Sequence, residues 1–160
     1  MTVLAPGTPV PPFSLGTEEG GRFTEADLDG HTTVLVFYPF AFSPVCSDQL
    51  SLYQEVMGEL EGQGARLYGV SCDSSYSQRA FRQQLGVSIP QLSDWEPKGE
   101  TCRAFGVLHD QGFPERALVI VGPDRTVRWS HQAPSPGDLP GANVLFDGLA
   151  AAAGATAPRA

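Results

Sequence analysis

The chain has 160 residues, of which 41% are hydrophobic, and a formal net charge of −8 at pH 7. This length suits one globular domain, because a domain of about 150 residues buries roughly 70% of the surface that its unfolded chain exposes. The acidic charge argues against a nucleic-acid partner, whose phosphates attract clustered Lys and Arg, and no apolar stretch approaches the ~20 residues of a membrane helix.

The N-terminus lacks the basic and apolar regions of a signal peptide, so we expect a cytoplasmic protein. The three cysteines are far apart and odd in number, which is typical of reduced thiols and not of a disulfide framework. No Cys-x-x-Cys motif occurs, and the three histidines lack the spacing of zinc ligands. We therefore expect no metal site and no dithiol redox motif.

The N-terminal third predicts a hairpin, a buried strand and a helix. Residues 10–24 contain two short extended segments around a Gly-rich turn, and residues 34–38 are apolar enough for a core strand. After Ser43, apolar side chains recur at spacings of three and four. This pattern predicts an amphipathic helix that ends at Gly62 and Gly64.

The middle third predicts a second strand and two helices. Residues 66–71 form the strand, which we expect to be parallel to the first because a helix connects them. A helix follows a Ser74 cap and ends at Gly86, residues 89–94 form a loop or a short extended segment, and a short helix covers about 98–105.

The C-terminal third predicts a β-hairpin from residues 117–121 and 126–129, then a helix over about 143–153. A β-α-β unit followed by a hairpin and a closing helix is the order of a thioredoxin-like α/β fold. We expect a central mixed sheet flanked by helices, with an N-terminal hairpin. The predicted organisation is a single domain over residues 1–153 and a flexible tail over 154–160.

Cys46 lies in the first turn of the predicted helix, directly after the first core strand. Ser43 suits the N-cap, and Pro44 suits the first helical position, where an N–H would have no partner. The free N–H groups of a helix N-terminus favour a thiolate at Cys46. Binding sites of open sheets form beyond the carboxyl ends of parallel strands, which is where Cys46 falls. The sequence thus predicts a reactive cysteine.

The motif Pro39-x3-Ser43-x2-Cys46 resembles the peroxidatic motif of the peroxiredoxins, Pro-x3-Thr/Ser-x2-Cys. Further segments resemble that family in the same order, at residues 69–74, 92–99 and 104–107, and Arg116 stands where the family places its active-site arginine. The similarity spans roughly residues 5–150. It is closest to the one-cysteine group that resembles alkyl hydroperoxide reductase E.

The resemblance implies a thiol-dependent peroxidase that reduces hydrogen peroxide, organic hydroperoxides or peroxynitrite through a sulfenic acid at Cys46, without a metal or organic cofactor. It implies that Arg116 places a fixed positive charge at the sulfur, that the Ser43 hydroxyl donates to substrate or sulfur, and that Pro39 shields the sulfenic acid. It also implies a homodimer. Gln49 stands where many members carry Glu, so a Glu–Arg pair cannot form there.

The family's resolving cysteines have no counterpart here: Ser51 stands at the short spacing after Cys46, and the C-terminal tail has no cysteine. We therefore predict a one-cysteine mechanism that uses an external low-molecular-weight thiol or a thioredoxin- or glutaredoxin-like protein. Cys72 and, less favoured, Cys102 remain possible resolving thiols, although a structural role is preferred for both.

Two other functions remain as alternatives to the peroxidase. The first is a peroxide sensor or redox-controlled binding module, which would be oxidised without sustained turnover. The second is a dithiol–disulfide oxidoreductase, which the missing Cys-x-x-Cys motif disfavours.

Overall fold

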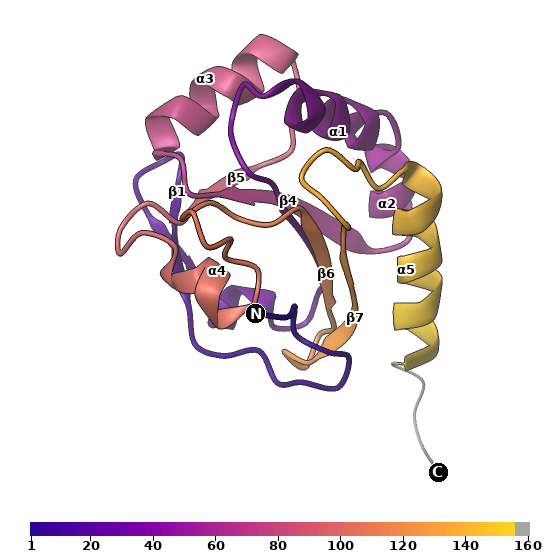
Figure 1. Cartoon of the computed structure of the whole chain (residues 1–160). Coiled ribbons are helices and arrows are strands. Elements are labelled where there is room, and N and C mark those ends of the chain that lie inside the picture. The colour runs from indigo at the N-terminus through magenta and orange to yellow at the C-terminus, as the bar shows by residue number, and fades with distance from the viewer. Residues whose placement is uncertain (156–160) are drawn as a thin grey trace.

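Strand β3 (Thr32–Phe37) divides the core into two layers. Its side chains alternate: Val34 and Val36 lie in one apolar cluster, while Leu35 and Phe37 lie in the other, and all four are fully buried. A strand that is apolar on both faces must be covered on both. The computed structural model, which describes residues 1–155, shows such a sheet with helices on either side (Figure 1).

The sheet has seven strands in the order β2-β1-β5-β4-β3-β6-β7. The pairs β3–β4 and β4–β5 are parallel, and the other neighbours are antiparallel. The remaining strands are β1 (Ser14–Thr17), β2 (Arg22–Thr24), β4 (Ala65–Ser71), β5 (Gln91–Ser93), β6 (Ala117–Val121) and β7 (Val127–Gln132). The expected mixed α/β sheet with an N-terminal hairpin is therefore confirmed.

Five α-helices and a short 3-10 helix surround the sheet within residues 1–155: η1 (Glu25–Leu28), α1 (Pro44–Glu55), α2 (Met57–Gly62), α3 (Ser75–Leu85), α4 (Glu100–Ala104) and α5 (Ala142–Ala155). Apolar residues of α1, α2, α3 and α5 belong to one core cluster, and those of η1 and α4 belong to the other. None of these helices is long and apolar enough to cross a lipid bilayer.

The structure differs from the predicted elements in a few places. The helix after Ser43 is split at Val56 (φ −104°, ψ 5°), a β-branched residue near Gly58, and both residue types are poor helix formers. The segment at residues 89–94 contributes a true strand, β5. Helix α5 runs through 154–155, which were predicted in the tail, because its Ala-rich end favours helix. Residues 156–160 of that tail lie outside the described part.

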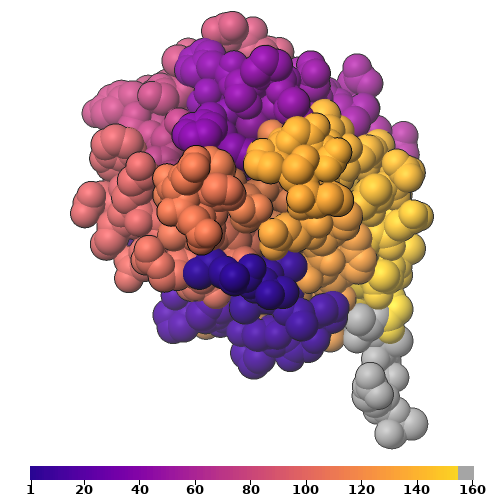
Figure 2. All heavy atoms as spheres, in the orientation of Figure 1, coloured from indigo at the N-terminus to yellow at the C-terminus, as the bar shows by residue number. Residues whose placement is uncertain are grey.

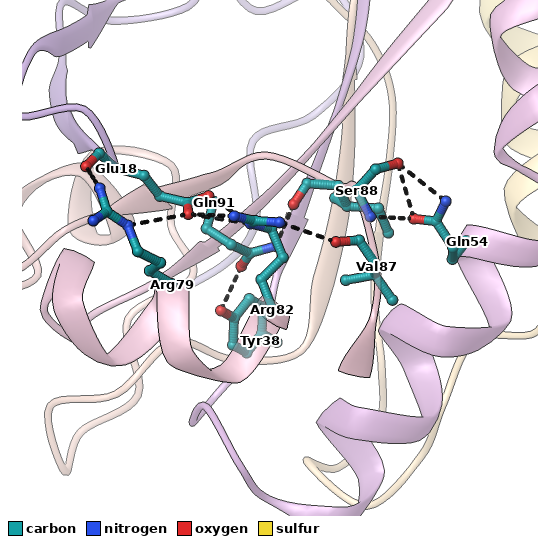
Figure 3. Close-up of polar contacts among 9 residues, drawn as sticks. Glu18, Tyr38, Gln54, Arg79, Arg82, Val87, Ser88 and Gln91 are labelled. Carbon is teal, nitrogen blue, oxygen red and sulfur yellow. Dashed lines mark hydrogen bonds and ion pairs between the residues drawn. The ribbon is translucent and has the colours of Figure 1, made fainter. Parts of the chain in front are cut away.

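The carboxyl end of β3 is fixed by the residue that follows it. The Tyr38 hydroxyl donates to Gln91 Oε1 over 2.6 Å, and Gln91 Nε2 donates to the Ile89 carbonyl (Figure 3). Gly69 of β4 makes room for this amide, since a Cβ there would come within 2.6 Å of Gln91 Oε1. Burial raises the pKa of Tyr38 far above its ordinary value, so the hydroxyl remains a neutral donor.

Polar contacts on the surface fasten helices α1 and α3 to the segments beside them (Figure 3). Arg82 forms a forked ion pair with Glu18, with Nε 2.9 Å from Oε2, and Arg79 donates to the Glu18 carbonyl. Gln54 and Ser88 exchange hydrogen bonds between α1 and the approach to β5. These contacts hold the helices that flank the carboxyl ends of β3, β4 and β5.

Candidate active site

Cys46 occupies the third position of helix α1, and its side chain is fully buried. Ser43 is the N-cap residue and Pro44 is the first helical residue, as predicted. The cap works through the backbone, because the Ser43 carbonyl accepts from Ser47 N at 2.9 Å while its hydroxyl makes no capping bond. Within the described residues the Ser43 hydroxyl has no partner, which leaves it available as a donor.

The Arg116 side chain contacts the Cys46 sulfur. Arg116 directly precedes β6, whose Ala117 pairs with Phe37, so its side chain starts beside the carboxyl end of β3. Its Nη2 lies 3.1 Å from Cys46 Sγ, and its Nε donates to the Pro136 carbonyl at 2.8 Å. The residue is only 2% exposed. The antiparallel pairing of β3 and β6 thus brings together a cysteine and an arginine that are distant in sequence.

The buried guanidinium has no carboxylate partner among residues 1–155. Its Nη1 donates instead to the neutral Gln49 Oε1 at 2.6 Å. A buried cation without an anionic partner is costly, because the protein interior screens charge poorly. The guanidinium therefore places an uncompensated positive charge beside the sulfur, where it can stabilise negative charge that develops on a reacting group.

Gln49 continues a chain of hydrogen bonds towards the loop before α5. Its Nε2 donates to the Tyr53 hydroxyl at 3.2 Å, and that hydroxyl donates to the Pro140 carbonyl at 2.7 Å. Burial raises the pKa of Tyr53 to about 12, so it stays protonated near neutral pH. In the sequence, Tyr53 is one of the apolar side chains that recur after Ser43. The i, i+4 spacing of Gln49 and Tyr53 was the available signal.

The loop between β7 and α5 covers this chain of hydrogen bonds. It supplies the carbonyls of Pro136 and Pro140, which bind Arg116 and Tyr53. In Figure 1 the loop passes beside α1, and in Figure 2 its yellow-orange atoms lie against the purple atoms of that region. The loop therefore helps to keep Arg116 pointing at the sulfur.

A second anchor holds the loop between β3 and α1. The Asp73 carboxylate accepts from Ala41 N and from the Ser71 hydroxyl, both at 2.8 Å through Oδ2. Pro39 is buried at the start of the loop. Phe42 adopts φ 70°, an uncommon conformation for a non-glycine residue, and its ring lies 5.3 Å from that of Phe81. The role of Asp73 was missed, because the spacing does not reveal which backbone amide it binds.

The other two cysteines lie away from this arrangement. Cys46 belongs to the apolar cluster that α1 and α3 cover, whereas Cys72 and Cys102 belong to the cluster on the opposite face of the sheet. All three are free thiols. Cys72 lines a cavity of about 190 Å³ beside Pro39, and Trp95 also lines it. Of the candidate site residues, the structure thus brings Arg116 to Cys46, places Cys72 in the wall of one cavity with Pro39, and groups Cys72 with Cys102.

Comparison with known proteins gives one consistent result. The AhpC/TSA family model matches residues 6–130. The chain is 33% identical to alkyl hydroperoxide reductase C of Amphibacillus xylanus over 129 residues (76% of this chain, 69% of that protein). It is 27% identical to alkyl hydroperoxide reductase E of Mycobacterium tuberculosis over 151 residues (93% and 98%). It is 32% identical to 1-Cys peroxiredoxin B of Oryza sativa over 150 residues (84% and 67%).

The solved structures agree with the sequence comparison. The crystal structure of Enterococcus faecalis AhpC superposes with a TM-score of 0.84 at 28% identity, and the match covers 96% of this chain and 93% of that one. The similarity thus extends over nearly the whole chain, including the strands and helices that carry Cys46 and Arg116.

Proposed function

The chain belongs to the AhpC/TSA family of peroxiredoxins and so performs thiol-dependent peroxide reduction, for which we propose Cys46 as the nucleophile and Arg116 as the cation that activates it. The observation that carries this assignment is the buried guanidinium 3.1 Å from the sulfur, with a neutral amide as its nearest side-chain partner. Such a cation stabilises a thiolate without being titrated away near neutral pH.

The first step is attack of the Cys46 thiolate on one peroxide oxygen. A sulfur–oxygen bond forms, the oxygen–oxygen bond breaks, and the electron pair leaves with the second oxygen, which is protonated to water or an alcohol. Arg116 faces the sulfur and stabilises the negative charge as it spreads over the oxygens. The Ser43 hydroxyl supplies a further donor, and Pro39, which lacks an N–H, closes the site on one side.

The sulfenic acid at Cys46 is returned to the thiol by an external reductant. An incoming thiolate attacks the sulfur, a mixed disulfide forms and water leaves; a second thiol then releases Cys46. This one-cysteine mechanism is supported by the placement of Cys72 and Cys102 in the core of the opposite sheet face. The reductant is a low-molecular-weight thiol or a thioredoxin- or glutaredoxin-like protein.

The surface near the site supports a homodimer as the working form. Phe40, Phe42 and Trp95 are about half exposed, at 49%, 48% and 54%. Phe40 and Trp95 line one cavity, Phe42 lies in the same loop as Phe40, and exposed large apolar side chains are typical of protein contacts. Light scattering coupled to size-exclusion chromatography measures the mass of the protein in solution. We expect the double variant Phe40→Ser, Phe42→Ser to shift that mass towards the monomer.

The proposed compartment is the cytoplasm, which suits three reduced thiols.

Trapping the first oxidation product tests the proposed nucleophile. After one equivalent of hydrogen peroxide with a sulfenic-acid trap present, we expect one adduct by intact mass, mapped to Cys46. Cys72 and Cys102 remain free in the same sample, because neither faces Arg116. A Cys46–Cys72 or Cys46–Cys102 linkage contradicts the one-cysteine mechanism, and an adduct elsewhere contradicts the site.

Gln49→Glu tests whether the uncompensated charge of Arg116 activates the thiol. A carboxylate at this position pairs with Arg116 Nη1 and weakens the electrostatic stabilisation that Arg116 gives to negative charge at Cys46. We expect the rate of Cys46 alkylation, followed across pH, to fall near neutral pH, and the rate of oxidation to fall with it. Gln54→Glu near the C-terminal end of the same helix, where Gln54 contacts Ser88 and not Arg116, is the matched control, and its profile should equal that of the wild type.

A further inference from the structure

A second pair of thiols lies on the sheet face opposite Cys46. Cys72 directly follows β4, and Asp94 directly follows β5, its parallel neighbour; Asp94 N donates to the Ser71 carbonyl at 2.8 Å. Helix α4 brings Cys102 to the same place, where its backbone N–H donates to Asp94 Oδ2 at 2.8 Å. The two sulfurs and a carboxylate oxygen all lie within 4.8 Å of one another.

We propose that Cys72 and Cys102 are a redox pair that closes to a reversible disulfide when peroxide is in excess, independently of Cys46. The two sulfurs already lie side by side, so only a short approach is needed to join them. Both residues are buried, at 5% and 0% exposure. This proposal goes beyond the peroxidase reaction, since it concerns thiols that the reaction does not use.

Cys72 is the member that peroxide reaches. It lines the cavity of about 190 Å³ that also has Phe40, Asp73 and Lys98 in its wall. Lys98, the only lysine of the chain, lies in the same wall. The Asp73 carboxylate there is already engaged, because its Oδ2 accepts two hydrogen bonds. Cys102 lies behind Cys72 in the core and is fully buried.

The chemistry balances with peroxide as the oxidant. The Cys72 thiolate attacks one peroxide oxygen, the oxygen–oxygen bond breaks, and the leaving oxygen is protonated, which gives a sulfenic acid and water or an alcohol. The Cys102 sulfur then attacks the Cys72 sulfur; the disulfide forms, the sulfur–oxygen bond breaks, and the departing hydroxide takes the Cys102 proton as water. Two thiols thus lose two electrons to one peroxide.

Asp94 suits the role of proton carrier in the second step. Its carboxylate lies beside both sulfurs and accepts the Cys102 proton before passing it to the departing hydroxide. Hydrogen bonding to Cys72 and burial raise the pKa of Cys102 well above its ordinary value, so Cys102 stays protonated until its neighbour is oxidised. This order makes Cys72 the attacking thiol and Cys102 the resolving one.

The same three groups resemble a partial site for a soft cation, but the structure favours the disulfide. Both Asp94 oxygens already accept backbone N–H groups, from Thr101 at 3.1 Å and Cys102 at 2.8 Å. A divalent ion held by two thiolates and a carboxylate leaves a net negative charge in the core, which is costly. A disulfide is neutral and leaves both hydrogen bonds of Asp94 in place.

The test uses the full chain with Cys46→Ser, so its result does not depend on the proposed peroxidase site. The reduced protein is exposed to excess hydrogen peroxide, denatured, and labelled with a thiol reagent. We expect intact mass to show the loss of two hydrogens with no label, and peptide mapping to join Cys72 to Cys102. Dithiothreitol should restore two labels. Adding Cys102→Ser should instead leave a trappable sulfenic acid at Cys72.

Other outcomes overturn the proposal. If both thiols remain labelled after peroxide, or if Cys72 proceeds to a sulfinic acid while Cys102 stays free, the two do not act as a pair. The purified protein could instead contain stoichiometric zinc. If a chelator removes that zinc and both cysteines then react with the thiol reagent, the three groups form a metal site and not a redox pair. Circular dichroism before the reaction must match the parent, which excludes oxidation of unfolded chains as the source of a linkage.

Discussion

Replacing Cys46 with serine abolishes peroxide turnover, with an expected loss of about four orders of magnitude or more. Serine occupies nearly the same volume, but its hydroxyl does not ionise near neutral pH and is a poor nucleophile towards a peroxide oxygen. Serine fits the space of the cysteine side chain, and its hydroxyl can accept from Arg116 Nη2 as the sulfur does, so the fold should persist. Peroxide consumption with dithiothreitol or thioredoxin as the reductant measures the effect.

Cys72→Ser is the matched control for this experiment. It removes a cysteine of similar burial on the other sheet face, so turnover should remain near that of the wild type. Equal losses in both variants contradict the one-cysteine mechanism, and full turnover in Cys46→Ser contradicts the assignment of the nucleophile. A sensor would behave differently: the wild-type protein would be oxidised once and would then consume no more peroxide with any thiol present.

Local sequence patterns predicted the helices and strands well, because the pattern of each segment reflects which of its own side chains are buried. The apolar run around Val34 and Val36 is buried on both faces and forms β3, an interior strand of the sheet. The Ser74 cap and Gly86 end of α3 are observed, with Ser74 accepting from Ser77 N at 3.2 Å and Gly86 at φ 69°. Both are short-range effects that need no tertiary context.

Contacts between distant segments were not predictable in the same way. The pairing of β3 with β6 decides that Arg116 lies beside Cys46, and only the family resemblance suggested it in advance. Nothing in the spacing shows that Pro136 and Pro140 provide acceptors for Arg116 and Tyr53, because backbone carbonyls carry no sequence signature. The sheet order likewise depends on packing of whole layers.

Arg116→Met, the second large effect, should slow oxidation of Cys46 by about two to three orders of magnitude. Methionine is long and apolar, so it fills much of the space but removes the charge at the sulfur. The loss should be greatest near neutral pH and smaller in alkali, where the thiolate forms without help. Stopped-flow measurement of the first oxidation, across pH, separates this effect from slow reduction by the external thiol.

Arg116→Lys separates the effect of the positive charge from the effect of the hydrogen-bond geometry in the same measurement. The guanidinium uses three nitrogens for three partners, Cys46, Gln49 and Pro136, whereas an ammonium group cannot reach all three at once. The rate of Cys46 oxidation in Arg116→Lys should therefore lie between the rates of the wild type and of Arg116→Met.

Arg116→Met also leaves the Gln49 and Pro136 oxygens without a donor, which costs about 1–3 kcal/mol of folding free energy for each buried group. Urea unfolding must therefore show that this variant is folded at the assay temperature. A folded Arg116→Met protein that is oxidised as fast as the wild type contradicts the role of this residue.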